Sequence, residues 1–468
     1  MDYSEYLARK MSLPPTARMD VSPSDLPCGL YSFQRDLVIR ALHRGRYCLF
    51  TDTGTGKTAM QLAWAKQVSR EGRVLILTPL AVAEQTVREG ARFGIDAVYR
   101  RNDDDRAPIT VANYEMLDHF DPGEFTGIVL DESSILKSYD GKTRNQIITA
   151  FAQTPYRLAC TATPSPNDHM ELGNHSEFLG VKTRAEMLSE FFVHDGGSTS
   201  SWRLKGHARK SFWGWVSGWA SVMHLPSDLG YSDDGFILPP MVIHEHVVEC
   251  DHREAWSEGF LFAPHATTLN EQRAVRRATT AKRAAIIAEI AESDEPAIVW
   301  CELNGEADAI EKSIPGAVQI KGSDSLDEKV KRLVGFADRD YRVLVTKPSI
   351  AGFGMNWQHC ALVVFAGVSH SFEQTYQAVR RCWRFGQKRE VHVHFIRAEQ
   401  ESAIVDNYRR KEAEHGEMIY QMVSNATNNE VQQRWNRYEP KTAVRAPKWL
   451  SGSKKAKAGR SITVTASR

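Results

Sequence analysis

A glycine-rich segment near the N-terminus, TDTGTGKTA at residues 51–59, constrains the fold of this chain more than any other feature. It follows the apolar run YCLF (47–50) and precedes the helical pattern MQLAWAKQV (60–68). A strand, a glycine-rich turn and a helix start are the context that identifies a phosphate-binding loop. Gly54 and Gly56 let the backbone curl, so that successive N–H groups and the helix N-terminus form an anion site. A simple Gly-Thr turn is the weaker alternative, although Thr51 stands where the strict pattern has glycine.

This loop predicts a nucleotide site with a bound cation. Lys57 is expected to contact the β- and γ-phosphates, and the hydroxyl of Thr58 is expected to ligate Mg²⁺. The residues predicted to surround the phosphates are Thr53, Gly54, Thr55, Gly56, Lys57 and Thr58.

A pair of acids ends the apolar run GIVLDESS (127–134), about 75 residues after the loop. Ligands of α/β proteins bind at the carboxyl ends of strands, which is where this pattern places both side chains. Asp131 is predicted to hold Mg²⁺, and Glu132 to act as the general base on the attacking water. Alone, such a pair also fits a helix cap; its position after a phosphate loop favours the catalytic interpretation.

Short apolar runs alternate with amphipathic stretches in two regions of the chain, and this alternation predicts an α/β fold with mostly parallel sheets flanked by helices. In the first region the runs are 47–50, 74–79, 109–114, 127–132 and 156–162. In the second they are 297–301, 317–322, 342–348, 361–367 and 391–396. We therefore expect an N-terminal lobe at 1–170 and a C-terminal lobe at 291–425, joined by a helical, Trp-rich insertion at 171–290.

The expected insertion contains Trp202, Trp213, Trp215 and Trp219 among basic residues. Such a stretch stacks on unpaired bases in some proteins, but tryptophans at this spacing more often belong to a core, and we favour a helical brace. His244, His246, His392 and His394 lack a paired cluster of further ligands in the sequence, so ordinary side chains are expected rather than a metal site.

The charge distribution gives no global basic field, because the formal net charge is +1. Residues 441–468 carry eight basic and no acidic side chains, which leaves 51 basic and 58 acidic residues in the rest. We interpret residues 426–468 as a basic, flexible tail that either contacts a polyanion or only aids solubility. Scattered cysteines, no apolar leader and no membrane-length apolar run predict a cytoplasmic protein.

Further segments follow in an order that resembles the superfamily 2 helicases, from about residue 31 to 396. YSFQRDLVIRAL (31–42) resembles the Q motif, LTPLAVAEQ (77–85) motif Ia, VANYEML (111–117) motif Ib, DESS motif II and TATPSPND (161–168) motif III. AIVWCELN (297–304) resembles motif IV, KPSIAGFGMNW (347–357) motif V and QAVRRCWRFGQKREVHVHFI (377–396) motif VI.

The pattern of motif VI, together with DESSILKS and the LPP at 238–240, resembles the Swi/Snf-like branch and its small bacterial and phage relatives. Arg380 departs from this pattern, which usually has glycine there. The resemblance implies two RecA-like lobes, with Gln34 reading adenine and with Gly354, Asn356 and Gln377 near the nucleotide. It also implies arginine fingers, for which Arg381 and Arg384 are the candidates, because arginine makes planar bidentate contacts with phosphate.

The resemblance further implies a nucleic-acid path across both lobes, formed by Thr78, Pro79, Tyr114, Thr346 and Lys347. We therefore expect an ATP- and Mg²⁺-dependent DNA helicase or translocase without sequence specificity. We expect a monomer that works with replication, recombination or repair proteins of a phage or bacterium. The alternatives are an RNA helicase and an ATP-switched clamp or loader with little turnover; Glu132 argues against the switch, which has little use for a general base.

Overall fold

The computed structural model describes residues 17–424, except for 80–81, 138–140, 166–167, 195–201, 250–268, 352–354, 368, 370, 402–408, 412, 414–415 and 422. The basic tail predicted at 426–468 lies outside the described residues. In the described part of the chain, no helix is both long and apolar enough to span a membrane.

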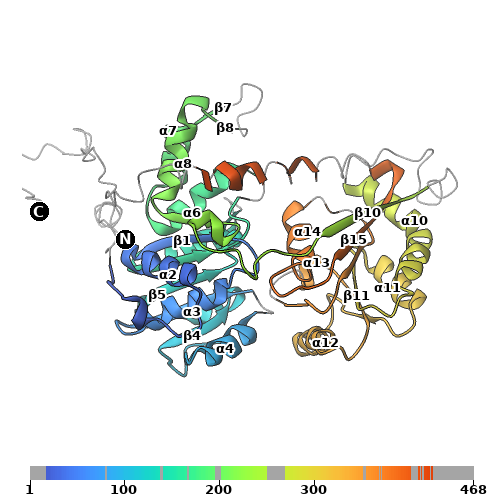
Figure 1. The fold of residues 1–468 in the computed structure, drawn as a ribbon, viewed down its shortest axis with the longest axis horizontal. Helices are drawn as coiled ribbons and strands as arrows, with labels where there is room; N and C mark the ends of the chain where they lie inside the picture. The colour runs from blue at the N-terminus through green and yellow to red at the C-terminus, as the bar shows by residue number, and fades with distance from the viewer. Residues whose placement is uncertain are drawn as a thin grey trace, which may run out of the picture. The chain divides into compact units, whose positions relative to one another are not determined.

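A seven-stranded, entirely parallel sheet forms the core of the first lobe (Figure 1). Its strand order is β3-β4-β2-β5-β6-β1-β9. The strands are β1 (Arg46–Thr51), β2 (Arg73–Thr78), β3 (Val98–Tyr99), β4 (Ile109–Asn113), β5 (Phe125–Asp131), β6 (Tyr156–Cys160) and β9 (Ala220–Met223).

Both faces of this sheet are buried, which explains why its central strands are continuously apolar. Along β1, Phe50 packs in one apolar cluster and Leu49 in another, and alternate residues of β2 and β5 divide in the same way. One face is covered by α2 (Ser32–Arg44), α3 (Lys57–Val68) and α4 (Ala83–Arg92). The other is covered by α5 (Lys142–Ala150), α6 (Leu172–Leu179), α7 (Arg184–Phe191) and α8 (Arg209–Ser217).

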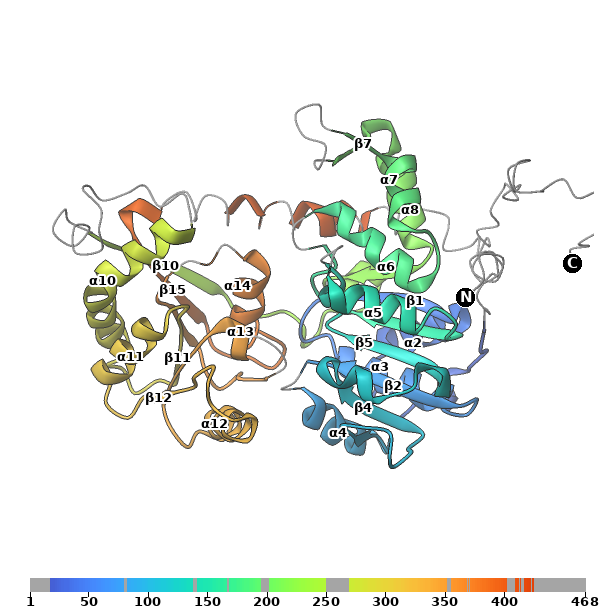
Figure 2. The ribbon, with the colours of Figure 1, turned by 180° about the vertical axis from the view of Figure 1, so that it is seen from behind.

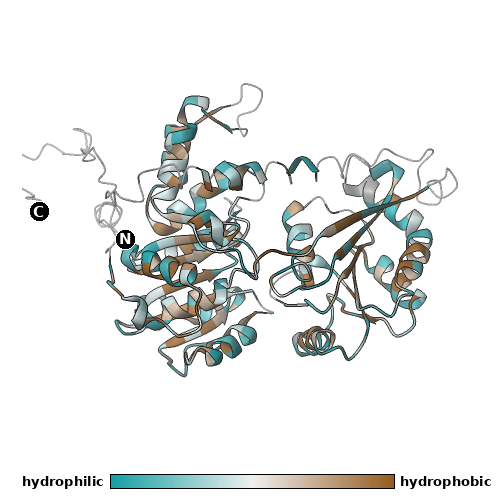
Figure 3. Ribbon diagram, in the orientation of Figure 1, coloured by the Kyte–Doolittle hydropathy of each residue, from teal (hydrophilic) through white to brown (hydrophobic). Residues whose placement is uncertain are grey.

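The second lobe contains a six-stranded parallel sheet with the order β10-β15-β14-β11-β13-β12. The strands are β10 (Met241–Val248), β11 (Ala297–Trp300), β12 (Val318–Gln319), β13 (Val343–Thr346), β14 (Leu362–Phe365) and β15 (Val391–Ala398). Its helices are α10 (Leu269–Ile290), α11 (Asn304–Ser313), α12 (Leu326–Asp338), α13 (Pro348–Ala351) and α14 (Phe372–Val379). Figure 2 shows these helices from behind, and Figure 3 shows the apolar character of the strands in both sheets.

The two parallel sheets flanked by helices confirm the predicted fold class of two RecA-like α/β lobes. The ten predicted strands are all present as β1, β2, β4, β5, β6, β11, β12, β13, β14 and β15.

The segment 171–290 differs from the expected insertion, because the two sheets divide it between them. Strand β9 pairs with β1, while β10 pairs with β15 over eight residues. Within this segment, the antiparallel pair β7 (Phe192–His194) and β8 (Trp202–Leu204) is separate from both large sheets.

The tryptophans of this region mostly serve the first lobe. Trp213 and Trp219 are 2% and 4% exposed and belong to the apolar cluster on one face of its sheet. Trp202 and Trp215 are half-buried against the same cluster. This packing matches the favoured helical brace and leaves Trp213 and Trp219 unable to stack on bases.

Candidate nucleotide site

The glycine-rich loop connects β1 to α3, as its sequence context predicted. Gly54 and Gly56 have φ of 84° and 83°, a left-handed conformation that glycine adopts without a Cβ penalty. Gly56 is the N-cap of α3, so the first free N–H groups of that helix face the loop. Lys57 lies at the first turn, and its Nζ donates to the carbonyl oxygens of Thr51 at 2.9 Å and Asp52 at 3.1 Å. The lysine is therefore held inside the loop that it is predicted to share with the phosphates.

Gln34 of helix α2 lies against this loop. Its Nε2 donates to the carbonyl of Thr55 at 2.8 Å, and its Oε1 accepts from the backbone N–H of Tyr31 at 2.9 Å. A Cβ at Gly56 would lie 2.3 Å from that Nε2, so only glycine permits this approach. Gln34 thus supports the loop in this structure, next to the position at which it is predicted to read adenine.

The acidic pair ends strand β5 beside the loop. Asp131 Oδ1 accepts from Gln61 Nε2 of α3 at 2.7 Å. Thr161, after β6, donates to Glu132 Oε2 at 3.4 Å. Burial raises the pKa of both carboxyls, while nearby Lys57 opposes the shift in each. A raised pKa makes Glu132 a stronger base, as the predicted role requires.

Glu132 has a φ of 52°, which is rare for a residue with a Cβ. Such strained residues cost on the order of 1–3 kcal/mol and are typical of functional sites, where the surroundings hold them. Here Ser133 Oγ is 3.0 Å from Nε2 of His175, which is fully buried. The contact between Ser133 and His175 therefore holds the sharp turn that follows β5.

The arginines of motif VI follow α14 and lie near Glu132. Arg381 is buried and Arg384 is half-buried, and each is within electrostatic range of the Glu132 carboxylate. Burial lowers the pKa of Arg381 to about 10 and lowers that of Arg384. Gln377 Oε1 accepts from Arg381 Nη2 at 3.0 Å, which orients this guanidinium.

Three buried polar atoms in this part of motif VI have no hydrogen-bond partner. They are Nε of Arg380, Nε of Arg384 and Nε2 of Gln377. A guanidinium with a buried, unsatisfied N–H fits an anion such as a triphosphate. Thr58 and Asp131 offer hydroxyl and carboxylate oxygens, the ligand type that Mg²⁺ prefers. The residues present therefore fit both the nucleotide and the cation predicted for them.

Most of the residues predicted to contact nucleic acid have buried side chains. The side chains of Thr78 and Thr346 are fully buried, and Tyr114 is 7% exposed. Tyr114 donates its hydroxyl to the carbonyl of Asp131 at 2.7 Å. These three side chains lie in the core of the structure, and nucleic-acid contact at these positions stays a prediction. Pro79 and Lys347 are half-buried.

The remaining predicted nucleotide residues are placed as follows. Thr55 is buried and donates to the Asp52 carbonyl at 2.7 Å, whereas Thr53 is half-buried. Asn356 is exposed, and Gly354 lies outside the described residues.

Sequence reasoning missed four residues around the loop. Two contacts join α14 to the first lobe: Glu373 binds Lys137, and Tyr376 donates to Asp52. His224 contacts the same Asp52 carboxylate. The one available signal was the spacing of Tyr376 and Arg380, which places both on one face of a helix that also carries Gln377.

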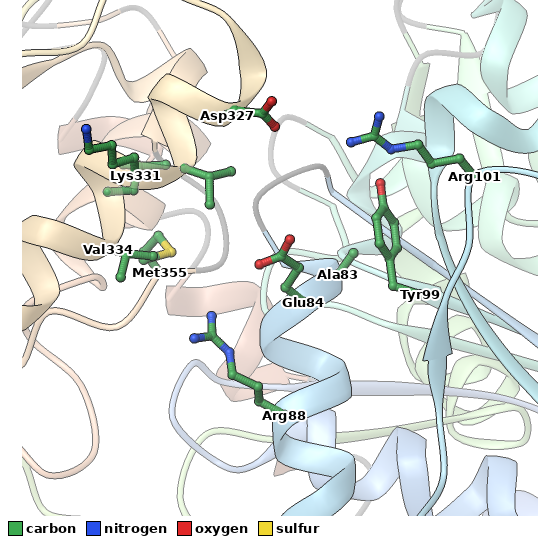
Figure 4. A pocket seen from close by; sticks show the side chains of 11 residues that line it. Ala83, Glu84, Arg88, Tyr99, Arg101, Asp327, Lys331, Val334 and Met355 are labelled. Carbon is green, nitrogen blue, oxygen red and sulfur yellow. The ribbon is translucent and has the colours of Figure 1, made fainter.

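A separate cleft of about 290 Å³ lies between α4 and α12 (Figure 4). Glu84 and Arg88 of α4, with Tyr99 and Arg101, face Asp327 and Lys331 of α12. Met355 of motif V also lines this cleft, which holds both signs of charge and is distinct from the glycine-rich loop.

The four histidines singled out in the sequence meet on adjacent strands β10 and β15. His244 Nε2 lies 3.0 Å from His392 Nδ1, and His246 Nε2 lies 2.9 Å from His394 Nδ1. Among the described residues, no group of three or more potential ligands has the arrangement of a metal site.

Two family models match this chain. "Type III restriction enzyme, res subunit" matches residues 29–166, and "Helicase conserved C-terminal domain" matches residues 281–386. The two matches cover the regions that contain the glycine-rich loop and the motif VI arginines.

Curated relatives and a solved structure are also similar. The protein named "DNA annealing helicase and endonuclease ZRANB3" is 24% identical over 426 residues in Mus musculus and 23% identical over 427 residues in Homo sapiens. Each alignment covers 81% of this chain but 39% of the relative, so the chain spans well under half of these proteins. The structure "Sulfolobus solfataricus SWI2/SNF2 ATPase core in complex with dsDNA" overlaps with a TM-score of 0.39 and 16% identity, covering 89% of this chain and 98% of that one.

Proposed function

Because the chain belongs to helicase superfamily 2 and to its Swi/Snf-like branch, we propose that it is a DNA-dependent ATPase that translocates along DNA or unwinds it. The observation that carries this proposal is the position of Glu132. It lies at a strand end beside Lys57 of the first lobe, within electrostatic range of Arg381 from the second lobe. Hydrolysis of a phosphoanhydride needs this combination of a base and several cations.

The residues divide the chemistry between the two lobes. Lys57 and the loop amides bind the β- and γ-phosphates, and Glu132 orients the attacking water and accepts its proton. Mg²⁺ held by Thr58 and Asp131 neutralises charge on the phosphate oxygens when it is bound. Arg384 stabilises the charge that develops on the transferred phosphoryl group.

Dividing one site between two lobes couples hydrolysis to movement. Nucleotide binding favours the arrangement in which the arginines meet the phosphates, and product release removes that preference. DNA held by both lobes is then displaced in each cycle. Contacts to the phosphate backbone explain why no sequence preference is expected.

The first test is steady-state ATP hydrolysis with no nucleic acid, single-stranded DNA, duplex DNA or RNA. We expect strong stimulation by DNA, and loss of turnover in Glu132→Gln and Lys57→Ala. Glu132→Gln is expected to retain ATP binding, whereas Lys57→Ala is expected to weaken it, because Lys57 is proposed to bind the phosphates and Glu132 only the attacking water.

Other outcomes decide between the alternatives. Stimulation by RNA in preference to DNA would identify an RNA helicase. Tight ATP binding with negligible turnover under all conditions would favour an ATP-switched clamp, and the motor proposal would then be rejected.

A further inference from the structure

A compact polar cluster joins the glycine-rich loop to helix α14. Asp52, the residue directly after β1, accepts from Arg380 Nη2 at 2.8 Å and lies 2.8 Å from His224 Nδ1. Its other oxygen accepts from the Tyr376 hydroxyl at 2.7 Å and from the Thr53 amide at 2.6 Å. The carboxylate is thus saturated, and two of its four partners come from the second lobe.

This ion pair is buried, so it cannot be a weak surface contact. The side chains of Arg380 and Asp52 are 5% and 8% exposed. The guanidinium also lies over the rings of Tyr376 and Trp383, at 5.1 and 4.4 Å from their centroids. Loss of one partner would leave a buried charge without compensation, a change that is strongly unfavourable.

Asp52 is also part of the phosphate-binding loop. Its carbonyl accepts from Lys57 Nζ, while its carboxylate binds Arg380. Nearby, a Cβ on Gly54 would lie 2.9 Å from the backbone N of Phe385, so the loop and motif VI are in close approach. The loop and the arginine-bearing segment therefore meet at a residue that contacts both.

Helix α14 is held to the first lobe at both ends. Near its N-terminus, Glu373 forms an ion pair with Lys137, which follows the acidic pair. At its C-terminus, Arg380 binds Asp52, and Arg381 and Arg384 follow within four residues. The direction in which these two arginines leave the helix thus depends on where Arg380 is anchored.

We propose that the Asp52–Arg380 ion pair positions the motif VI arginines over the glycine-rich loop, so that Arg380 is a positioning residue for hydrolysis. This inference rests on the proposed ATPase function. It assigns a role to the residue at which the chain departs from the motif VI pattern.

The main test is the kinetics of Arg380→Ala with and without DNA. We expect kcat to fall on the order of 10–100-fold, because a small displacement of a catalytic group has effects of that size. KM for ATP should rise as well, since the Asp52 carboxylate would lose its main counter-charge beside the phosphate site.

A second variant separates position from charge. In Asp52→Asn combined with Arg380→Ala, no uncompensated carboxylate remains, so KM should return to within about threefold of the wild-type value while kcat stays low. Recovery of kcat in this double variant would overturn the positioning role, because charge alone would then explain the single variant.

Coupling to Arg384 gives an independent criterion. If Arg380 acts by positioning Arg384, then Arg380→Ala should lower kcat little further, less than about threefold, in an Arg384→Ala background. Fully multiplicative losses would overturn the proposal. The matched control is Arg144→Ala, which breaks the ion pair between buried Arg144 and half-buried Glu177 inside the first lobe. This control should reduce stability but leave kcat per folded molecule unchanged.

Hydrogen exchange tests the contact without turnover. We expect amides in residues 51–56 and 380–387 to exchange faster in Arg380→Ala than in the wild type, and unchanged exchange would overturn the proposal. An inactive wild-type protein would refute the proposed function, whereas an active wild type with an equally active Arg380→Ala would refute only the positioning role.

Discussion

The paired histidines of β10 and β15 make the second lobe sensitive to acid. The rings of His244 and His394 stack with centroids 4.4 Å apart, and His246 and His392 flank them. Burial, followed by repulsion from the other three rings, lowers the pKa of His394 to about 4. Burial and the neighbouring histidines also lower the pKa of His244, which Glu390 partly opposes.

The sign and size of the effect follow from this shift. An unfolded histidine titrates near about 6.5, so the unfolded chain takes up a proton before folded His394 does. The stability that neutral His394 contributes is fully present above about pH 6.5, the unfolded pKa. It is lost as the pH falls toward the folded pKa of about 4. At about 1.4 kcal/mol per unit the upper bound is about 3 kcal/mol, and partial exposure reduces the expectation to roughly 1–2 kcal/mol.

The perturbation is His394→Asn, compared with the wild type at pH 7.5 and 5.0. Unfolding in urea is monitored by hydrogen exchange of the amides in β10 and β15. This measurement reports on the stability of the second lobe separately from that of the first. Between pH 7.5 and 5.0 we expect the free energy of unfolding to fall by about 1–2 kcal/mol more in the wild type than in the variant. His207→Asn, at an exposed position of the first lobe, is the control. An equal pH dependence in wild type and His394→Asn would refute the reasoning.

Three substitutions test the nucleotide site. Arg384→Ala should slow hydrolysis on the order of 10³-fold or more while ATP affinity changes little; normal turnover would exclude the finger role. Gly54→Ala should abolish turnover in a folded protein, because its Cβ would meet Phe385 and the φ of 84° is unfavourable for alanine. Unaltered activity with an unaltered circular dichroism spectrum would contradict the close approach of Phe385 to the loop. Tyr114→Phe removes the hydrogen bond to Asp131 and should cost about 0.5–1.5 kcal/mol of stability without changing DNA affinity; a selective loss of DNA binding would instead support the contact inferred from motif Ib.

The central strands of both sheets could be predicted because burial on both faces makes them continuously apolar. The edge strands β3, β9 and β10 could not, whereas the edge strand β12 could. Strand β10 alternates His244, Glu245 and His246 with apolar residues, and two of those apolar residues, Ile243 and Val247, are 47% and 51% exposed. A partly exposed edge strand has no continuous apolar run, and β9 has only four residues beside a Trp-rich helix. The segment 171–290 therefore resembled an insertion, although its strands complete two sheets.

The position of the candidate site followed from local motifs, since Lys57, Asp131 and Glu132 are each placed by a strand end or helix start. The contacts between lobes join residues more than 200 positions apart, such as Lys137 with Glu373 and Asp52 with Arg380. No local pattern encodes these pairs. Motif order also singled out Tyr114 but could not predict its burial, because the pattern does not distinguish a side chain on the surface from one beneath it.

The two halves of the site differ in how firmly they are held. The acidic pair is fixed within the first lobe: Gln61 and Tyr114 bind Asp131, and His175 binds the neighbouring Ser133. These contacts maintain the unfavourable backbone of Glu132 whatever the second lobe does. The arginines depend instead on α14, which the Lys137–Glu373 and Asp52–Arg380 pairs attach to the first lobe. An activator that shifts the second lobe therefore acts on the approach of the arginines, not on the geometry of the base.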